Sequence, residues 1–256
     1  MIEAQEKIRA LFYSNVTDEN HRFEFDLFNV SVTQKLWSTE QDYKELVGLD
    51  INDFQEPPYV LDTKSDDIAG SKTQSISTMT SQTRPVNIQE YCRHLNRLLD
   101  GFFMNSLSAL DALAHQISAL YDLDNTSDDI YITSIAGMLR PLHPNSKAQR
   151  FLLEQIQEDW FKQYKLFRVC TTHESLIGSD ITLRVDQSIP GYRQPKTVLP
   201  DEPKVRPFTY AKDLEVTKYC QSTLGKIQAL ITGVYDNILV DISEANNILP
   251  IPRTRL

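Results

Sequence analysis

Apolar residues recur at helical spacing through a long central stretch of the chain, residues 88–121, which contains one glycine and no proline. A continuous helix over this stretch would be about 50 Å long at 1.5 Å per residue. Steps of three, four and seven residues separate the positions that would form its buried stripe: Leu99, Phe103, Leu110, Leu113, Ile117 and Leu120. The pattern predicts a helix that serves as the spine of a bundle.

Two other stretches predict long amphipathic helices, residues 147–173 after an N-cap at Ser146, and residues 210–243. Shorter helices are expected at 2–14, 130–139 and 38–48, the last capped by Ser38 or Thr39. We expect the helices at 88–121 and 146–172 to pack antiparallel at the centre of the bundle. The two tryptophans, Trp37 and Trp160, are expected in the core.

Several segments lack a helical period. Residues 21–32 alternate in part and are expected to form a strand or an extended arm. Residues 63–84 are rich in Ser, Thr, Asp and Gln, which predicts a mobile linker or loop. Residues 174–209 contain five prolines and short β-prone runs, which predicts an inserted hairpin with loops, and the tail at 247–256 is expected to be extended.

The predicted fold class is therefore all-α, an antiparallel helical bundle with a four-helix core and a small extended or β-prone insertion at about 174–209. Three parts are expected. Residues 1–62 form an N-terminal helical and extended segment packed on the core, 63–84 the linker, and 85–256 the bundle.

Composition narrows the possible partners. The net charge is −9 and the isoelectric point is near 5.1, which does not fit a general nucleic-acid binder. The charge is unevenly spread, because residues 140–212 carry 12 Lys and Arg against 8 Asp and Glu, whereas the rest carries 14 against 27. An anionic partner is thus expected to approach residues 140–212.

The three cysteines form no C-x-x-C pair, and the N-terminal residues lack the apolar core of a signal peptide. The chain also has no run of 18 apolar residues. We therefore expect a cytoplasmic protein without a membrane span. No G-x-x-x-x-G-K-[ST], G-x-G-x-x-G, H-E-x-x-H or G-x-S-x-G motif occurs. We accordingly expect no cofactor and no metal site.

A polar line runs beside the apolar stripe of the spine and consists of Asn105, Ser108, Asp111 and His115. Asp111 and His115 are four residues apart, so their side chains can meet on one helix face. One interpretation is a surface ion pair with small residues at a helix contact. The other is a site completed by a second helix.

The best candidate for that second helix ends with Arg168-Val-Cys-Thr-Thr-His173. Histidine can exchange a proton near neutral pH, and a guanidinium fits the oxygens of a phosphate, so the pair suits metal-independent RNA cleavage. The alternative is structural, with the arginine in a salt bridge and the histidine interacting with the helix dipole. Residues five apart on an ideal helix lie about 140° apart. One straight helix therefore cannot direct both side chains to one phosphate, and either the helix loosens at Thr171–Thr172 or two chains combine.

Two stretches, residues 102–121 and the R-x4-H pattern at 168–173, resemble the HEPN superfamily. The members of this superfamily are helical nucleotide-binding and ribonuclease domains of prokaryotic toxin–antitoxin and antiviral defence systems. The resemblance covers roughly residues 85–243. It implies a four-helix core, a homodimer across the motif helices, RNA as substrate and a cognate antitoxin or defence partner. It also implies catalytic roles for Arg168 and His173.

Two functions follow as expectations. The first is a metal-independent endoribonuclease, with Asp111 or Asn105 orienting the catalytic pair and substrate contacts from Asn105, Ser108, His115, Thr172 and Arg140. The second is a catalytically inactive module for dimerisation or partner binding. The second is favoured by the acidic net charge and by Val169, which follows the arginine where active HEPN members commonly have Asn, Asp or His.

Overall fold

The computed structural model describes residues 1–54, 87–123, 130–173, 182–185, 195–204 and 207–244, with the side chains of 171–173, 182–185, 195, 196 and 244 outside the description. The fold is all-α with a small strand insertion, as predicted. The elements, in chain order, are α1 (Ile2–Asn15), α2 (Glu19–Gly48), the 3-10 helix η1 (Ile51–Phe54), α3 (Ile88–Leu120), α4 (Ile132–Leu142), α5 (Lys147–Gln157), α6 (Asp159–His173), β1 (Thr182–Val185), β2 (Pro195–Leu199), β3 (Leu214–Glu215) and α7 (Val216–Glu244).

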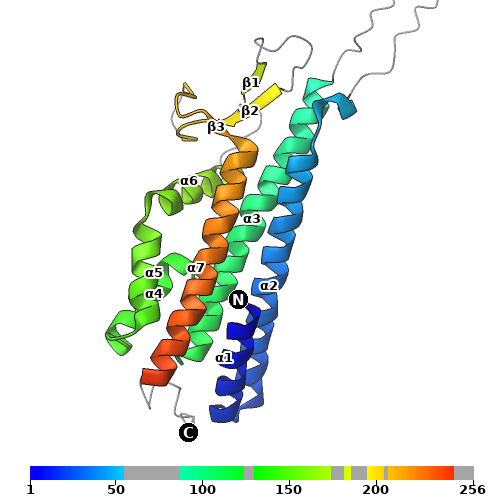
Figure 1. Ribbon diagram of the computed structural model, residues 1–256. Helices are drawn as coiled ribbons and strands as arrows, with labels where there is room; N and C mark the ends of the chain where they lie inside the picture. The colour runs from blue at the N-terminus through cyan, green and yellow to red at the C-terminus, as the bar shows by residue number, and fades with distance from the viewer. Residues whose placement is uncertain (55–86, 124–129, 174–181, 186–194, 205–206, 245–256) are drawn as a thin grey trace, which may run out of the picture.

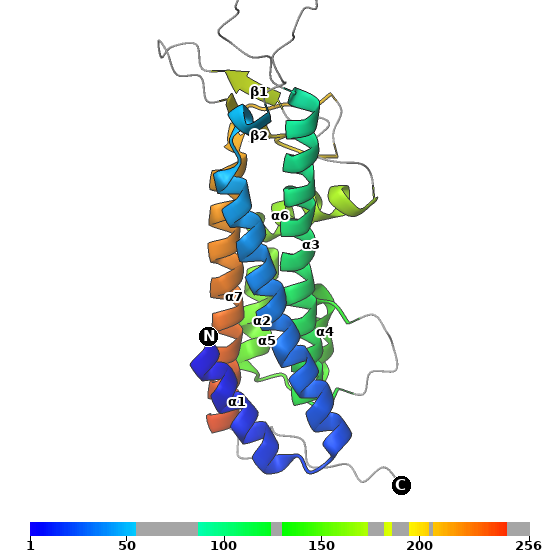
Figure 2. The same ribbon diagram turned by 90° about the vertical axis from the view of Figure 1, so that its right-hand side faces the viewer.

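The helices form three layers. α3 and α7 lie in the middle, α1 and α2 cover one side, and α4, α5 and α6 cover the other (Figures 1 and 2). α2 and α5 run toward the end that carries the small sheet, whereas α3 and α7 run away from it (Figure 1). No helix in the described ranges combines the length and the apolar character that a membrane span requires.

The spine is present as predicted. α3 covers Ile88–Leu120, and its apolar stripe from Leu99 to Leu120 is buried. The helix begins at Asn87, whose side chain accepts a hydrogen bond from the N–H of Glu90 at 3.1 Å. This acceptor satisfies one of the N–H groups that the first turn of a helix leaves without an internal partner.

The prediction of an extended segment at 21–32 is wrong, because α2 is one continuous helix from Glu19 to Gly48. Asp18 caps it by accepting from the N–H groups of Asn20 and His21. Thr39, a predicted cap, lies in the helix interior and donates to the carbonyl of Lys35. The alternation that suggested a strand arises because α2 has apolar residues on two opposite faces.

The predicted single helix over 147–173 is broken. α5 ends at Gln157, Glu158 has extended backbone (φ −63°, ψ 145°), and α6 begins at Asp159 and crosses toward α3 (Figure 2). The most extensive helix contact of the bundle is between α2 and α3. The prediction that 88–121 and 146–172 form the centre was therefore wrong.

The inserted strands form an antiparallel sheet in the order β1-β2-β3 at the end of the bundle where α7 begins (Figure 1). Thr182 lies opposite Val198 in the first pair, and Leu199 lies opposite Leu214 in the second. The Tyr91 hydroxyl of α3 bonds the Thr197 hydroxyl of β2 at 3.1 Å, which fastens the sheet to the spine. β3 occupies residues expected to be helical, so the last helix begins at Val216 rather than at 210.

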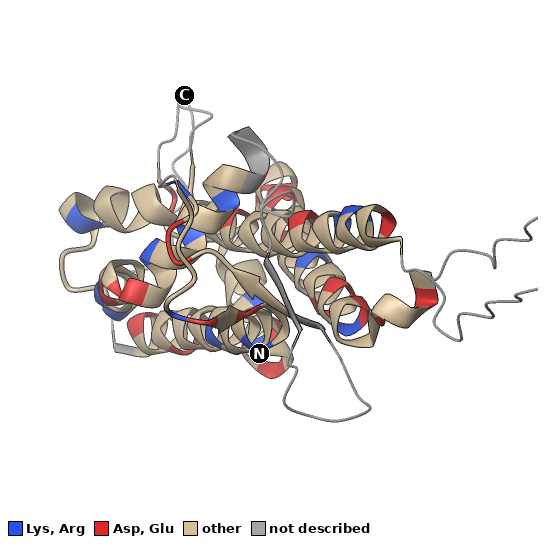
Figure 3. Cartoon of the chain, turned by 90° about the horizontal axis from the view of Figure 1, so that it is seen from above, with Lys and Arg blue, Asp and Glu red and all other residues tan. Residues whose placement is uncertain are grey.

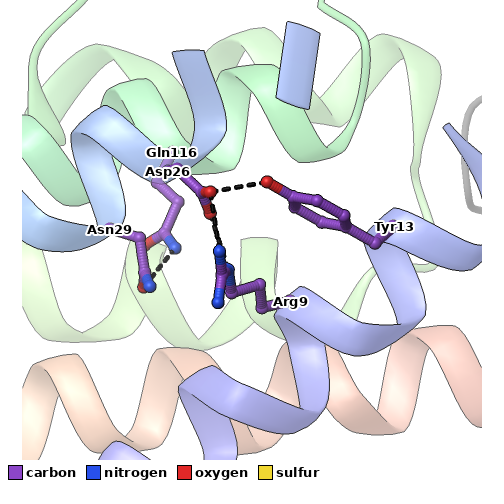
Figure 4. Close-up of polar contacts among 5 residues, drawn as sticks. All are labelled: Arg9, Tyr13, Asp26, Asn29 and Gln116. Atoms are coloured by element: carbon purple, nitrogen blue, oxygen red, sulfur yellow. Dashed lines mark hydrogen bonds and ion pairs between the residues drawn. The ribbon is translucent and has the colours of Figure 1, made fainter. Parts of the chain in front are cut away.

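α1 is held on α2 by a polar cluster. Arg9 donates to both carboxylate oxygens of Asp26 at 2.8 Å, and the Tyr13 hydroxyl donates to the same carboxylate at 2.5 Å (Figure 4). The hydrogen bond from Arg9 is the main cause that lowers the pKa of Asp26. A fixed guanidinium–carboxylate pair of this geometry is among the stronger polar contacts in proteins.

A second polar cluster links four helices through the interior. Gln5 of α1 donates to the Tyr235 hydroxyl of α7 at 3.0 Å, and that hydroxyl donates to the Gln116 side chain of α3 at 2.8 Å. Gln116 in turn donates to Asn29 of α2 at 2.9 Å (Figure 4). We call this series of contacts the four-helix hydrogen-bond series. The predicted linker at 63–84 and the tail at 247–256 lie outside the described residues.

Candidate functional site

The predicted polar line lies on the less buried side of α3. This helix lies between α2 and the α4–α6 layer (Figure 2). Asn105, Ser108, Asp111 and His115 are all partly exposed. Their contacts decide whether they form one site.

Asp111 faces the α4–α6 layer. Its carboxylate accepts a hydrogen bond at 3.2 Å from the N–H of Ile132, the first residue of α4. Burial raises the pKa of Asp111, while that hydrogen bond and the charges of Arg168, His115 and Lys165 act in the opposite direction. Arg168 of α6 therefore lies within electrostatic range of Asp111.

α6 is placed against α3 by contacts that the sequence did not reveal. The Tyr164 and Ser106 hydroxyls share a buried hydrogen bond of 2.9 Å. One turn further on, the Phe167 ring stacks on Phe103 with centroids 5.8 Å apart. These contacts position Arg168, which is half-buried, along the side of the spine.

Asn105 and His115 face α2 instead. The Asn105 amide donates to Asp42 at 2.9 Å, and the His115 ring stacks on Phe28 with centroids 4.7 Å apart. Burial raises the pKa of Asp42, and the bond from Asn105 opposes that rise. Burial lowers the pKa of His115, with Asp111 opposing. Two of the four polar-line residues thus contribute to the α2–α3 contact.

The remaining predicted residues are spread along α4 and α6. Arg140 is exposed in the last turn of α4, about 12 Å along that helix from the end that Asp111 binds. Thr172 and His173 are in the last turn of α6, and their side chains lie outside the described residues. α6 is assigned as helix through His173, so positions 168 and 173 lie about 140° apart around its axis.

A buried carboxylate that sequence reasoning did not single out caps α5 from another helix. Asp241 of α7 accepts from the Tyr121 hydroxyl at 2.8 Å, the Ser146 hydroxyl at 2.6 Å, and the N–H groups of Lys147 and Ala148 at 2.6 and 3.2 Å. The sequence could have indicated that Asp241 is buried, because it follows Val234 and Ile238 at helical spacing on the buried face. Its contacts are those of a structural anchor.

A pocket of about 580 Å³ lies where the end of α2 meets α3, the sheet and the start of α7. Its charged lining residues are Asp50, Glu215 and Lys218, and Lys218 pairs with Glu215 at 2.7 Å. None of the predicted site residues lines it.

The sequence analysis also did not identify the exposed apolar residues on the outward side of α2. The Trp37 side chain, expected in the core, is 61% exposed, and Phe23, Leu27 and Val30 are 68%, 52% and 50% exposed. Trp160, by contrast, packs against the core as expected. Exposed apolar groups gathered on one helix face are typical of an interaction surface.

Charged residues of both signs are interspersed along the helices (Figure 3). Over the described residues, no group of three His, Cys, Asp or Glu side chains is arranged to hold a metal ion. Comparison of the chain with protein-family models, with curated proteins and with solved structures found no match.

Proposed function

We propose that the chain is a helical module for dimerisation or partner binding, resembling a HEPN domain without ribonuclease activity. The observation that carries this proposal is the use of the polar line. Asn105 bonds Asp42, His115 stacks on Phe28, and Asp111 bonds the first N–H of α4. Side chains that hold α3 to α2 on one side and to α4 on the other do not converge on one substrate.

The motif helix supports the same proposal. With α6 helical through His173, positions 168 and 173 lie about 140° apart around the helix axis, and a phosphate needs both residues within hydrogen-bonding reach. Val169 follows the arginine in place of the polar residue common in active HEPN members.

A metal-independent endoribonuclease is the second candidate, and one observation favours it. The charge of Arg168 acts on Asp111, so a carboxylate lies within electrostatic range of the motif guanidinium. In this function a second chain would supply the His173 that faces the same phosphate, with His173 as general acid or base and Arg168 holding the phosphate.

RNA cleavage by purified protein separates the two functions. Wild type, His173→Ala and Arg168→Lys are incubated with structured and unstructured RNA in the presence of a chelator. We expect either no cleavage, or the same cleavage with all three proteins, which would come from a contaminating ribonuclease. Wild-type cleavage that leaves 2′,3′-cyclic phosphate ends and is lost in both variants would overturn the proposal, because a lysine in place of Arg168 keeps the charge but not the planar fork.

A further inference from the structure

α2 carries a second apolar face, which we call the α2 stripe, formed by Phe23, Leu27, Val30 and Trp37. Each of these side chains is at least half exposed. The face toward the bundle is formed by Phe25, Val32 and Leu36, which are at most 3% exposed and lie about half a turn around the helix. A helix that is apolar on both faces is normally covered on both.

No described element covers the stripe. α2 stands at the edge of the bundle in Figure 1 and at the front in Figure 2. The helix is 30 residues long, about 45 Å, and is capped at its start by Asp18. It therefore offers a long, straight and well-formed surface to a partner.

The spacing of the stripe identifies the kind of partner. Phe23, Val30 and Trp37 repeat every seven residues, and Leu27 lies three residues before Val30, which is the 3-4 spacing of a seam between two paired helices. A surface complementary to such a seam is another helix with the same spacing. This chain contains one in its own α2.

We propose that the α2 stripe is a homodimer interface, in which α2 packs antiparallel against α2 of a second copy with Val30 at the two-fold axis. This inference names the partner of the module proposed above and so rests on that proposal. In this register Phe23 and Trp37, each seven residues from Val30, lie opposite each other across the axis. A two-fold interface of this type uses the same patch on both copies.

Charge complementarity supports the antiparallel register. Glu24 and Lys35 are exposed, and they lie about 20° apart around the helix axis, so both flank the same side of the stripe. In an antiparallel pair these equal sides face each other. Glu24 is six residues before Val30 and Lys35 is five after it, which places Glu24 beside Lys35 of the partner subunit, twice by symmetry.

The dimer also separates the two motif helices. α6 lies in the layer on the far side of α3 and α7 from α2 (Figure 1). Pairing through α2 therefore leaves the α6 helices of the two copies on opposite outer sides, where they cannot share one phosphate. The interface thus agrees with a non-catalytic module.

Sedimentation velocity over micromolar concentrations tests the interface. We expect wild type to dimerise, and Trp37→Glu and Phe23→Glu each to raise the dissociation constant by about 30-fold or more, as central aromatic contacts usually do. Leu142→Glu is the matched control, because Leu142 is an apolar residue of α4 with 56% exposure outside the stripe. It should leave dimerisation unchanged, and circular dichroism should show all variants folded.

Charge exchange tests the direction of pairing. Glu24→Lys and Lys35→Glu should each weaken the dimer severalfold, and the double variant should restore it, because the exchange re-forms both pairs. Additive weakening in the double variant would overturn the antiparallel register.

Crosslinking tests the position of the axis. In a Cys92→Ser background, which leaves the buried Cys170 and Cys220, Val30→Cys should crosslink with a short bismaleimide. Lys44→Cys should not, because it lies far from its own copy in an antiparallel pair. Crosslinking at both positions would indicate a parallel pair.

A wild-type protein that is monomeric at all concentrations, or a dimer unaffected by Trp37→Glu, would overturn the inference. Neither result depends on RNA cleavage. Motif-dependent cleavage would overturn the proposed function and leave the dimer result to stand on its own.

Discussion

Two carboxylates of the bundle have opposite surroundings. Asp241 is buried near the end of α7, and Asp100 is half-buried in the first half of α3. Asp241 is 3% exposed and accepts four hydrogen bonds, two of them from the first turn of α5. Asp100 is partly buried, and no donor to it occurs among the described residues. Burial raises the pKa of Asp100 to about 6.

The difference teaches that burial alone does not decide what a charged group does for a fold. Where a helix N-terminus and hydroxyl groups donate hydrogen bonds to the carboxylate, the charged group holds those elements in place. Where a partly buried carboxylate has no such donors, burial makes its ionised form costly. The lower end of the bundle should therefore be sensitive to loss of a carboxylate, and upper α3 should gain from it.

Replacement of Asp241 should have the largest effect. Asp241→Ala removes the acceptor of Tyr121, Ser146 and the α5 N-terminus, and should lower the free energy of unfolding by about 3–5 kcal/mol. Urea denaturation measures the change. Asp236→Ala, on the exposed side of the same helix, is the control and should change stability by less than about 0.5 kcal/mol. Similar losses in both variants would contradict an anchoring role for Asp241.

Two glycines of α7 compare packing at the α5–α7 contact with an exposed position on the same helix. A Cβ at Gly233 would collide with the Phe151 ring of α5, whereas a Cβ at Gly225 would meet nothing within 4 Å. Gly233→Ala should therefore lower stability by about 1–3 kcal/mol, despite the better helix propensity of alanine. Gly225→Ala should raise it by up to about 1 kcal/mol. Thermal melts of the two variants should shift in opposite directions, and equal shifts would mean that α5 is not packed tightly on α7.

Asp100→Asn should have a smaller effect than loss of Asp241, and it should be stabilising. The folded-state pKa of about 6 exceeds the unfolded value of about 3.9, so the folded protein holds this proton more tightly. The wild-type contribution is thus complete below about pH 4 and is lost as the pH rises through about 6. At neutral pH Asp100→Asn should gain about 1–2 kcal/mol, and the gain should vanish near pH 4.

Unfolding measured across this pH range checks the sign, with Asp236→Asn as the exposed control. A gain that persists at low pH would mean that ionisation of Asp100 is not its origin.

How well the sequence predicted each helix depended on how many of its faces are apolar. α3 has one buried stripe, and its period was visible in the sequence. α2 is apolar on two faces, so Phe23, Phe25 and Leu27 mimic the alternation of a strand. The break at Glu158 has no glycine or proline to mark it, and the apolar spacing continues on both sides. Packing of α6 across α3 decides that break, and this contact is not local in sequence.

The candidate site was predictable only as far as helix periodicity reaches. Spacing placed Asn105, Asp111 and His115 along one side of α3, and chemistry indicated Arg168 as a neighbour of Asp111. Which helix each side chain meets depends on partners distant in sequence, such as Asp42 for Asn105 and Ile132 for Asp111. Asp241 illustrates the same limit, since it is 95 residues from Ser146.

The four-helix hydrogen-bond series determines the alignment of the helices along their axes. Apolar faces tolerate a slide of one turn, about 5.4 Å, because similar side chains recur at that interval. Such a slide would carry Gln5, Tyr235, Gln116 and Asn29 out of reach of one another and bury amide and hydroxyl groups without partners, at about 1–3 kcal/mol each. Competing alignments of the same bundle are thereby excluded. Apolar replacements of similar size would leave a helical protein that no longer selects one arrangement.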